Sequence, residues 1–514
     1  MEKIVSVIPA PQRIVNKNDL LNIESGFYLS SGQNDLPEDL SSYLPFLAQQ
    51  IEGCGCKCST KEKVQSACPI KLSVLTGTDA KAEAYKLNIT IKEILIEAAD
   101  KAGAFYAIQT LKQLIISNKT NLPCLEIYDY PAFKWRGFLF DNCRFFFSVD
   151  FIKTVLDLLA FHKMNRFHWH LTDDQGWRFN VPEYPLLAKI GSQREAHTMP
   201  LLKDNYNDYT ERREYYYTDE MIKEVVAYAE KLNITVVPEI ELPGHVSALL
   251  ASYPEYGCTG GPYKVENRWG IFEDVLCLGN EKIFDIYTAA FKTLKRLFPG
   301  QWIHIGGDEC LTTRWQECPK CQALKKKLGL DSEKQLQSWI TGKMSEIIIS
   351  LGKSPIGWDE VLDNTEKFPL PKDVIVQSWR KVDGGKKPVS MKHFAIMSPQ
   401  DKCYLNFKNY DSFEEPGRLS FITLKTAYSF SPVSPDFTEE EKEYVLGGEC
   451  NLWTEDLPSS KVAEYMLFPR LCAISECLWL DNNKKDFEDF KKAIENHKKR
   501  LSFMNVLYYD GKVE

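Results

Sequence analysis

The spacing of hydrophobic and polar residues changes near residue 130 of the chain. Before it, Ile4–Ile14 and Tyr85–Glu97 have strand character, and Lys101–Ser117 carries apolar residues at helical spacing. After it, short apolar segments alternate with longer amphipathic ones. This change predicts a small α+β domain over residues 1–128, followed by a second domain over residues 129–514.

The second region predicts a regular alternation of strands and helices. Val149–His162, Thr218–Leu232 and Lys334–Ser350 have the spacing of amphipathic helices. Eight short segments have strand character: Trp135–Phe140, Arg166–Thr172, Thr235–Glu239, Ile303–Gly306, Pro355–Gly357, Val374–Ser378, Phe394–Met397 and Leu446–Cys450. This pattern predicts a (β/α)₈ barrel, in which the C-terminal ends of the strands carry the chemistry.

Two adjacent carboxylates, Asp308 and Glu309, follow one of these strands through a pair of glycines. Neighbouring acids repel, so one keeps its proton above its usual pKa while the other stays ionised. Glycosidic cleavage needs such an acid beside an anion. The alternative is a solvated loop with two acids. Polar and aromatic groups at the other strand ends argue against it: Asp141, Arg144, Asp173, Glu239, His245, Trp358, Trp379, Tyr404, Asn406, Trp453 and Glu455.

Composition limits the partners of the protein. The 514 residues are 44% hydrophobic and 26% charged, which is typical of a soluble globular protein with two or more domains. A net charge of −8 argues against binding to nucleic acid or to an anionic membrane surface. The sequence contains no run of about 18 apolar residues, so it does not predict a membrane-spanning helix. Small or neutral substrates fit this negative net charge better than nucleic acid or an anionic membrane does.

The N-terminal residues Met1–Leu20 lack the basic and apolar regions of a signal peptide, so the sequence predicts no targeting segment. A secreted or periplasmic protein whose leader had been removed would look the same. Compartment and oligomeric state therefore stay open.

Two groups of cysteines have spacings that suggest metal binding. Cys318 and Cys321 have the spacing of half a structural zinc site, and Cys54, Cys56 and Cys58 form a denser, less regular group. Neither group has a second well-spaced pair nearby. We therefore expect no bound metal and no cofactor, with loop thiols or a local disulfide as the simpler interpretation.

Read together, the strand-end segments resemble the family 20 glycoside hydrolases, the β-N-acetylhexosaminidases. The resemblance covers about residues 130–480, and the region before it is less specifically similar to the small domain that precedes this barrel. The matching segments are Arg136–Asp141, Arg144–Phe146, His168–Arg178, Val237–His245, His304–Glu309, Gly357–Glu360, Gln377–Trp379 and Asn451–Glu455.

The resemblance implies retaining, substrate-assisted cleavage through an oxazolinium intermediate, in which the 2-acetamido oxygen of the sugar is the nucleophile. Glu309 matches the general acid and base, and Asp308 matches the acceptor of the acetamido N–H. Tyr404 matches the group that holds the acetamido oxygen in line. His245 and Asp173 match a chain that reaches Glu309 and helps to set its protonation state.

The same resemblance assigns the walls of a pocket for one terminal 2-acetamido sugar. Trp358, Trp379 and Trp453 match indoles that enclose the acetamido methyl and the sugar face. The other matches are to groups that bind ring hydroxyls: Arg144, Asn406 and Glu455. We expect both N-acetylglucosaminides and N-acetylgalactosaminides to be cleaved from the non-reducing end. The sequence departs from the family at Glu241, where an Asp is usual, so Glu241 is left out of the predicted site.

Two other interpretations remain open. His168 and His170 lie two residues apart on a predicted strand and point to the same side, as in metal-dependent barrel hydrolases. A glycan-binding protein without turnover on the same barrel is the second. The presence of Glu309 and Asp308 argues against that second interpretation.

Overall fold

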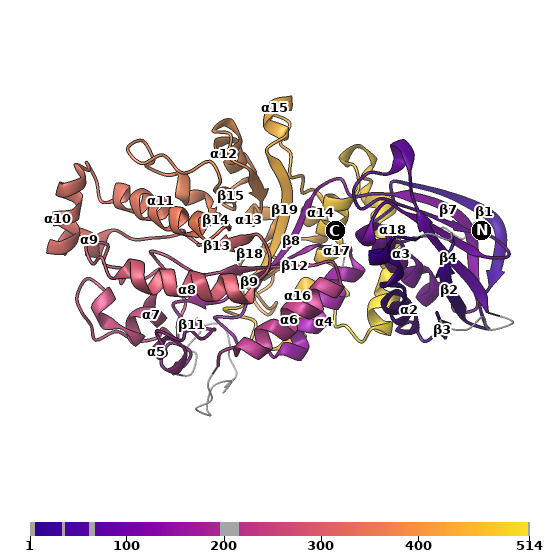
Figure 1. Ribbon diagram of the computed structural model, residues 1–514, viewed down its shortest axis with the longest axis horizontal. Coiled ribbons are helices and arrows are strands. Elements are labelled where there is room, and N and C mark those ends of the chain that lie inside the picture. The colour runs from indigo at the N-terminus through magenta and orange to yellow at the C-terminus, as the bar shows by residue number, and fades with distance from the viewer. Residues whose placement is uncertain (1–5, 33–35, 61–66, 196–214, 512–514) are drawn as a thin grey trace.

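The computed structural model describes residues 6–32, 36–60, 67–195 and 215–511 of the chain. A sheet domain formed by the N-terminal region lies beside a barrel formed by the rest (Figure 1). Within these residues, no helix has both the length and the apolar character that a membrane span needs.

The N-terminal domain is built on a seven-stranded mixed sheet with the order β1-β7-β5-β6-β4-β2-β3. The strands are β1 (Arg13–Asn22), β2 (Phe27–Ser31), β3 (Cys58–Ser59), β4 (Cys68–Val74), β5 (Tyr85–Ile89), β6 (Ile94–Ala98) and β7 (Asn121–Asp129). Three helices accompany them, α1 (Glu38–Ser41), α2 (Leu44–Glu52) and α3 (Lys101–Asn118). This confirms the predicted α+β character.

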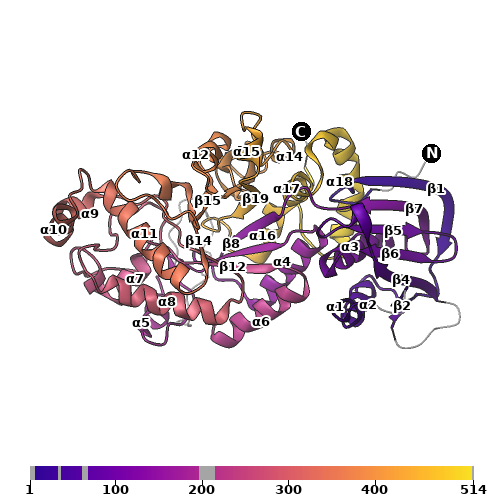
Figure 2. The same cartoon turned by 45° about the horizontal axis from the view of Figure 1, so that its top comes forward.

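Helix α3 packs between the sheet and the barrel (Figure 2). The Asp100 side chain caps its first turn by accepting a hydrogen bond from the Gly103 N–H at 2.8 Å. Residues 103–111 are all buried, as expected for a helix covered on every side. It contacts β5, β6 and β7 on one side and helices α4 (Val149–Phe161) and α18 (Phe487–Phe503) of the barrel on the other.

The predicted strand Ile4–Ile14 is wrong over most of its length, because β1 begins only at Arg13. Its first two residues lie outside the described part of the chain, and residues 6–12 form no strand because Pro9 and Pro11 have no N–H to donate to a ladder. The predicted strand Tyr85–Glu97 is instead the hairpin of β5 and β6. Its turn contains neither Gly nor Pro and is held by Thr90, whose hydroxyl accepts from the Glu93 N–H at 3.1 Å.

Eight parallel strands close the barrel in the order β12-β13-β14-β15-β16-β19-β8-β9. They are β8 (Trp135–Asp141), β9 (Arg166–His170), β12 (Thr235–Glu239), β13 (Trp302–His304), β14 (Ser354–Trp358), β15 (Ile375–Ser378), β16 (Ala395–Met397) and β19 (Val445–Leu452). Both ends of each strand lie within two residues of the ends predicted from the sequence. The predicted (β/α)₈ barrel is therefore confirmed.

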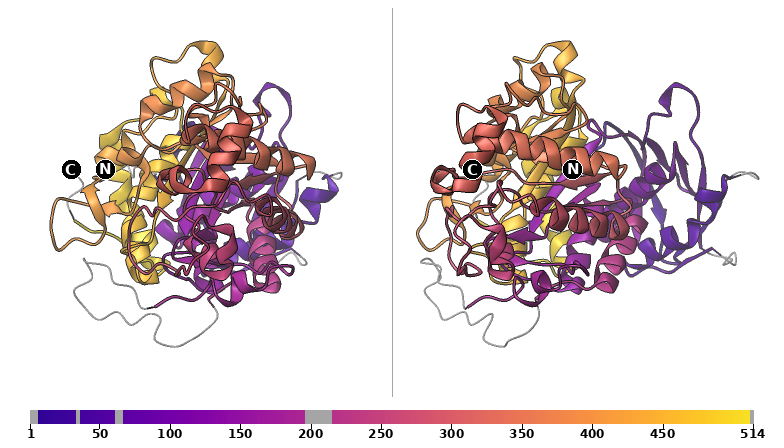
Figure 3. Two further views of the ribbon diagram at one scale, coloured as in Figure 1. Left: turned by 90° about the vertical axis from the view of Figure 1, so that its left-hand side faces the viewer. Right: turned by 60° about the vertical axis from the view of Figure 1, so that its left-hand side comes forward.

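Helices surround the barrel, as Figure 3 shows from two further sides. The three predicted helices are present as α4, α6 (Asp219–Lys231) and α11 (Lys334–Ser350). Ser148 and Thr218 cap the first two of these through their side-chain oxygens. The remaining helices are α5 (Leu186–Lys189), α7 (Ser247–Ser252), α8 (Ile283–Leu297), α9 (Thr313–Glu317), α10 (Pro319–Leu328), α12 (Lys386–Ser390), α13 (Gln400–Cys403), α14 (Leu424–Tyr428), α15 (Glu439–Lys442), α16 (Ser460–Leu467) and α17 (Arg470–Trp479).

Polar side chains fill part of the barrel interior. The His168 ring lies between two carboxylates, with Nδ1 2.7 Å from Glu449 Oε1 and Nε2 3.2 Å from Glu239 Oε2. Glu239 Oε1 also accepts from the Trp358 indole N–H at 2.9 Å and lies 2.8 Å from His304 Nδ1. Because these groups come from β9, β12, β13, β14 and β19, the network links five strands of the barrel.

Asp129, the last residue of β7, joins the sheet domain to the barrel. Its carboxylate lies 2.8 Å from the Lys163 ammonium and accepts from the Tyr85 hydroxyl at 2.6 Å. It also accepts from the Trp479 indole at 2.8 Å and from the Gln12 N–H at 3.0 Å. The Asp129 and Lys163 side chains are both fully buried. The interface between the sheet domain and the barrel therefore contains a buried ion pair, and several hydrogen bonds hold its two members.

We expect Asp129→Ala to lower the free energy of unfolding by about 3–5 kcal/mol, because it leaves the Lys163 charge buried without its partner. Denaturant unfolding followed by circular dichroism measures this. Glu126→Ala is the matched control on the same strand, where the ion pair with Lys17 is exposed, and it should change little. Equal free energies of unfolding for the two variants would show that Asp129 does not stabilise the interface between the sheet domain and the barrel.

Candidate active site

A pocket lies at the C-terminal ends of the barrel strands, where the active sites of such barrels are found. The structure brings every predicted site residue into its lining: Arg144, Asp173, His245, Asp308, Glu309, Trp358, Trp379, Tyr404, Asn406, Trp453 and Glu455. Trp269, Gln400, Phe407 and Arg418 also line it and were not predicted.

The backbone after β13 turns sharply to present the two adjacent carboxylates. Gly306, Gly307 and Glu309 have φ angles of 62°, 98° and 50°. A Cβ at Gly306 would lie 1.8 Å from Glu241 Oε2, and the positive φ of this residue would strain any other side chain, so glycine is favoured there. A left-handed residue other than glycine costs about 1–3 kcal/mol and is concentrated at functional sites. The turn leaves the Asp308 side chain 15% exposed and the Glu309 side chain 35% exposed.

His245 lies between two pairs of carboxylates. Its Nε2 is 3.6 Å from Glu309 Oε2 and 3.7 Å from Asp308 Oδ2. Its Nδ1 is 2.9 Å from Asp174 Oδ2 and 3.5 Å from Asp173 Oδ1. Although burial opposes the charge, Asp173 and these neighbouring carboxylates raise the pKa of His245 well above its usual value. A protonated imidazole therefore faces the catalytic candidates.

Asp174 positions the His245 ring; it lies in the matching segment His168–Arg178 but is not among the predicted site residues. It lies in the tight turn between the two short strands β10 (Thr172–Asp173) and β11 (Gly176–Trp177). Besides His245, its carboxylate accepts from both the N–H and the hydroxyl of Ser247, at 3.0 and 2.6 Å. Asp174 thus fixes the His245 ring and the start of α7 together.

Asp308 is poised between its two protonation states. Burial raises its pKa to about 6, and the neighbouring His245 cation partly opposes this rise. The Oδ1 atom is buried and has no hydrogen-bond partner among the described residues. An N–H donor on a bound ligand would supply that partner.

The Arg144 guanidinium is held by groups at the ends of three strands. Its Nη2 lies 2.8 Å from Asp173 Oδ2 and its Nη1 lies 3.2 Å from Asp141 Oδ2. Nε donates to Gln175 Oε1 at 2.9 Å, and Nη1 lies 3.8 Å from Glu455 Oε1. Although burial opposes the charge, Asp173 and Asp141 hold the pKa of Arg144 well above its usual value. The Arg144 guanidinium is therefore charged and fixed in position at one side of the pocket.

Aromatic rings form much of the remaining lining, and the Trp453 ring lies against the Arg144 guanidinium, with its centroid 5.3 Å from Cζ. Trp379 and Tyr404 stack with ring centroids 6.2 Å apart and an interplanar angle of 17°. The centroids of Trp358 and Trp453 are 5.9 Å apart, and both rings are nearly buried. The Trp379 indole N–H donates to Glu360 Oε2 at 2.9 Å, which fixes the orientation of its ring. Such rigid faces suit the apolar face of a sugar ring and a methyl group.

Two further polar groups, Asn406 and Glu455, line the pocket. The Asn406 Oδ1 atom is buried without a hydrogen-bond partner among the described residues. Burial raises the pKa of Glu455 to about 7, against the opposing charge of Arg144. Both groups are therefore able to exchange hydrogen bonds with ligand hydroxyls.

Two of the four unpredicted lining residues, Trp269 and Arg418, lie in long connections between elements. Trp269 lies against the Arg418 guanidinium, 4.4 Å from ring centroid to Cζ, and Arg418 in turn donates to Asp456 at 2.8 Å. Periodicity carries no signal in such connections, so the strand-end pattern could not reveal these two. Gln400 and Phe407 instead flank the predicted Tyr404 and Asn406 in the segment after β16.

The histidines of the rival metal interpretation lie below the pocket. Both ring nitrogens of His170 face carboxylates, those of Glu239 and Asp173. Although burial opposes the charge, these carboxylates raise the pKa of His170 to about 10, and similar contacts raise that of His168 to about 9. A protonated imidazole has no lone pair to offer a metal. Glu241, also outside the lining, is buried beside Gly306.

Comparison with known families gives two matches that together span most of the chain. The catalytic domain of glycosyl hydrolase family 20 matches residues 133–482, and domain 2 of the same family matches residues 5–130. The β-hexosaminidase of Porphyromonas gingivalis is 34% identical over 521 residues, which cover 99% of this chain. This chain spans 65% of the length of that relative.

Two further comparisons agree. The β-hexosaminidase of Akkermansia muciniphila is 31% identical over 425 residues, covering 81% of this chain and 83% of the relative. A crystal structure of an exo-β-N-acetylglucosaminidase from Vibrio harveyi, in complex with N-acetylglucosamine, superposes with a TM-score of 0.84 at 27% identity. That superposition covers 98% of this chain and 79% of the Vibrio chain.

Proposed function

The chain belongs to glycoside hydrolase family 20, and we propose that it is an exo-acting β-N-acetylhexosaminidase. It would release terminal, non-reducing N-acetylglucosamine or N-acetylgalactosamine from glycans. The observation that carries this proposal is the buried Asp308 Oδ1, which has no hydrogen-bond partner in the part of the chain that the structure describes and lies in a pocket that Tyr404 and three indoles also line. An acetamido N–H is a donor of the right kind for that oxygen.

In the proposed reaction the substrate supplies its own nucleophile. The acetamido oxygen attacks the anomeric carbon, the glycosidic C–O bond breaks, and Glu309 gives its proton to the departing oxygen. The resulting oxazolinium ion is then opened by water, which attacks the anomeric carbon while the Glu309 carboxylate takes its proton. Two inversions at that carbon give net retention.

Asp308 and Tyr404 position the acetamido group in this scheme. Ionised Asp308 accepts the acetamido N–H and stabilises the positive charge that develops on the ring. The Tyr404 hydroxyl, whose ring lies beside that of Trp453 in the pocket lining, would donate to the acetamido oxygen. Holding that oxygen in line with the anomeric carbon removes part of the entropic barrier to attack.

Arg144, Asn406 and Glu455 support recognition of a single terminal sugar. An amide both donates and accepts, and a carboxylate accepts from more than one direction. Asn406 and Glu455 can therefore satisfy a C4 hydroxyl in either the equatorial or the axial orientation. This supports acceptance of both the gluco and the galacto sugar.

Release of aryl sugars tests the proposed function. We expect hydrolysis of aryl β-N-acetylglucosaminide and β-N-acetylgalactosaminide, but almost none of the otherwise identical 2-hydroxy glucoside, which has no acetamido nucleophile. An oligosaccharide capped at its non-reducing end should be left intact. Binding of these sugars without turnover would favour the glycan-binding alternative, and internal cleavage of the capped chain would exclude an exo-acting site.

Replacement of the general acid tests the role of Glu309. Glu309→Gln should lower kcat on an unactivated disaccharide by about 10²- to 10⁴-fold while ligand binding persists. An aryl substrate with a good leaving group should lose less, because its departure needs little protonation. Glu317→Gln, at an exposed position in the nearby helix α9, is the matched control and should keep wild-type rates. A wild-type rate for Glu309→Gln on the disaccharide would remove Glu309 from this role.

The pH profile tests the coupling of His245 to Asp308. Since the ionised form of Asp308 is the active one and its pKa is about 6, kcat/KM should fall as pH drops through about 6. His245→Gln removes the cation that lowers this pKa, so the acid limb should move to higher pH. His393→Gln is the control, because that ring lies outside the pocket and contacts the Val374 carbonyl. An acid limb that stays in place in His245→Gln would contradict the coupling.

A further inference from the structure

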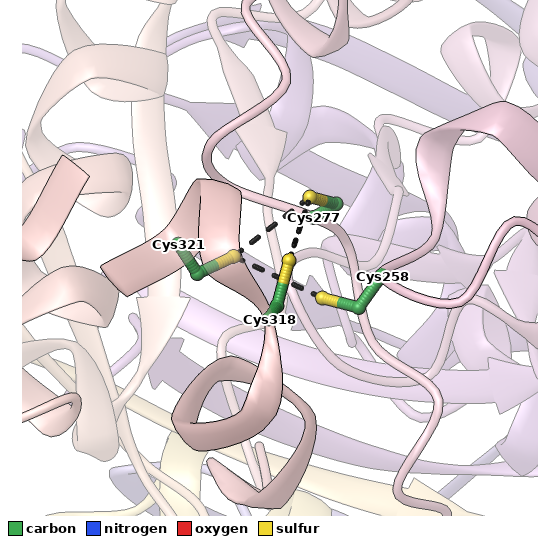
Figure 4. A group of neighbouring side chains, drawn as sticks. All are labelled: Cys258, Cys277, Cys318 and Cys321. Atoms are coloured by element: carbon green, nitrogen blue, oxygen red, sulfur yellow. Dashed lines mark hydrogen bonds between the residues drawn. The ribbon is translucent and has the colours of Figure 1, made fainter. Parts of the chain in front are cut away.

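Four cysteine side chains converge at the end of the barrel that lies farthest from the sheet domain (Figures 1 and 4). Cys258 and Cys277 lie in the connection that follows β12, and Cys318 and Cys321 lie at the start of α10. The Sγ–Sγ distances are 3.8 Å for Cys258–Cys321, 3.7 Å for Cys277–Cys318 and 3.8 Å for Cys277–Cys321. Three of the four residues are buried, and Cys258 is half-buried.

These distances match the edges of a tetrahedron around one metal ion. Four thiolates at the usual Zn–S distance of about 2.3 Å stand about 3.8 Å apart. A disulfide requires about 2.05 Å and gives each sulfur a single partner. Cys277 Sγ instead lies almost equally far from the sulfurs of Cys318 and Cys321.

The surrounding backbone is built to keep the sulfurs together. Cys318 and Cys321 are separated by two residues, Pro319 and Lys320, a common spacing in structural zinc sites. A Cβ on Gly279 would lie 2.3 Å from the Lys320 carbonyl carbon, so glycine lets the two segments approach closely. The Trp315 indole N–H donates to the Leu276 carbonyl at 2.8 Å and ties the same two segments beside the cluster.

We propose that Cys258, Cys277, Cys318 and Cys321 bind one structural zinc ion. All four ligands come from the protein, which leaves no open position for a substrate or an activated water. The ion is therefore separate from the pocket chemistry. The sequence led us to expect no bound metal, because the cysteines that complete the Cys318 and Cys321 pair lie in a different connection and have no regular spacing.

The ion would hold together the two ends of a long segment, residues 259–276, that reaches the pocket. Cys258 and Cys277 stand at the two ends of residues 259–276, and Trp269 of that segment lines the pocket. The middle of the segment is tied to the turn after β10, for example by the hydrogen bond from the Glu266 N–H to the Asp174 carbonyl at 3.0 Å. Removing the metal should therefore make residues 259–276 more mobile while the catalytic groups keep their positions.

Elemental analysis of the full-length wild-type protein tests the proposal directly. The protein should be purified without a metal-affinity step, and it should contain one zinc per chain, with X-ray absorption giving four sulfur neighbours at about 2.3 Å. Peptide mapping without reductant should find all four cysteines as thiols. Disulfides among them, iron in place of zinc, or no bound metal would each overturn the proposal.

A pair of buried-cysteine variants separates metal binding from packing. Cys277 and Cys124 are each 1% exposed, so Cys277→Ser and Cys124→Ser make the same chemical change at equal burial. Cys277→Ser should lose the zinc, lower Tm and become open to protease within residues 259–276, while Cys124→Ser should keep one zinc per chain. Full zinc content in Cys277→Ser would overturn the proposal.

If Cys277→Ser does not fold, titration of the wild-type protein with a mercurial gives the same information, because the zinc should be released as four thiols react. A zinc release that does not track these thiols would count against the site. Zinc content is measured without turnover. An inactive protein that holds zinc would therefore contradict only the proposed function, and an active protein without zinc would contradict only the metal site.

Discussion

A chain of buried charges connects the centre of the barrel to the pocket. Glu239 contacts His170 in the barrel, and His170 Nε2 lies 2.9 Å from Asp173. Asp173 in turn pairs with Arg144 and with His245, which line the pocket. Burying a charge away from its partner is costly, so each group is held where its neighbours can compensate it. The barrel interior thus fixes the imidazole that faces the two acids.

This arrangement explains how a buried carboxylate can work near neutral pH. Burial favours the neutral form of Asp308, and the charged His245 ring 3.7 Å away offsets part of that effect. The left-handed backbone at Glu309 and at His245 itself brings the groups together. Such conformations persist only where the surrounding structure holds them. The buried chain of charges supplies that restraint.

The sequence predicted the barrel and most of the pocket because strand periodicity marks where each strand ends, and strand ends in a barrel meet at one face. It failed where the deciding factor lies outside that pattern. Pro9 and Pro11 abolish a strand that apolar residues suggest, and Thr90 makes a turn without Gly or Pro. Trp269 and Cys258 reach their sites through long connections, whose course depends on tertiary packing.

In the proposed reaction the substrate provides the nucleophile and Asp308 stabilises the cyclic intermediate. Binding of a thiazoline mimic of that intermediate, measured together with intact protein mass during turnover of a 2-acetamido glycoside, tests it most directly. We predict that the mimic binds far more tightly than the product sugar, that Asp308→Asn loses most of this advantage, and that the protein mass does not change. Weak binding of the mimic, or a mass increase from a covalently attached sugar, would contradict the account.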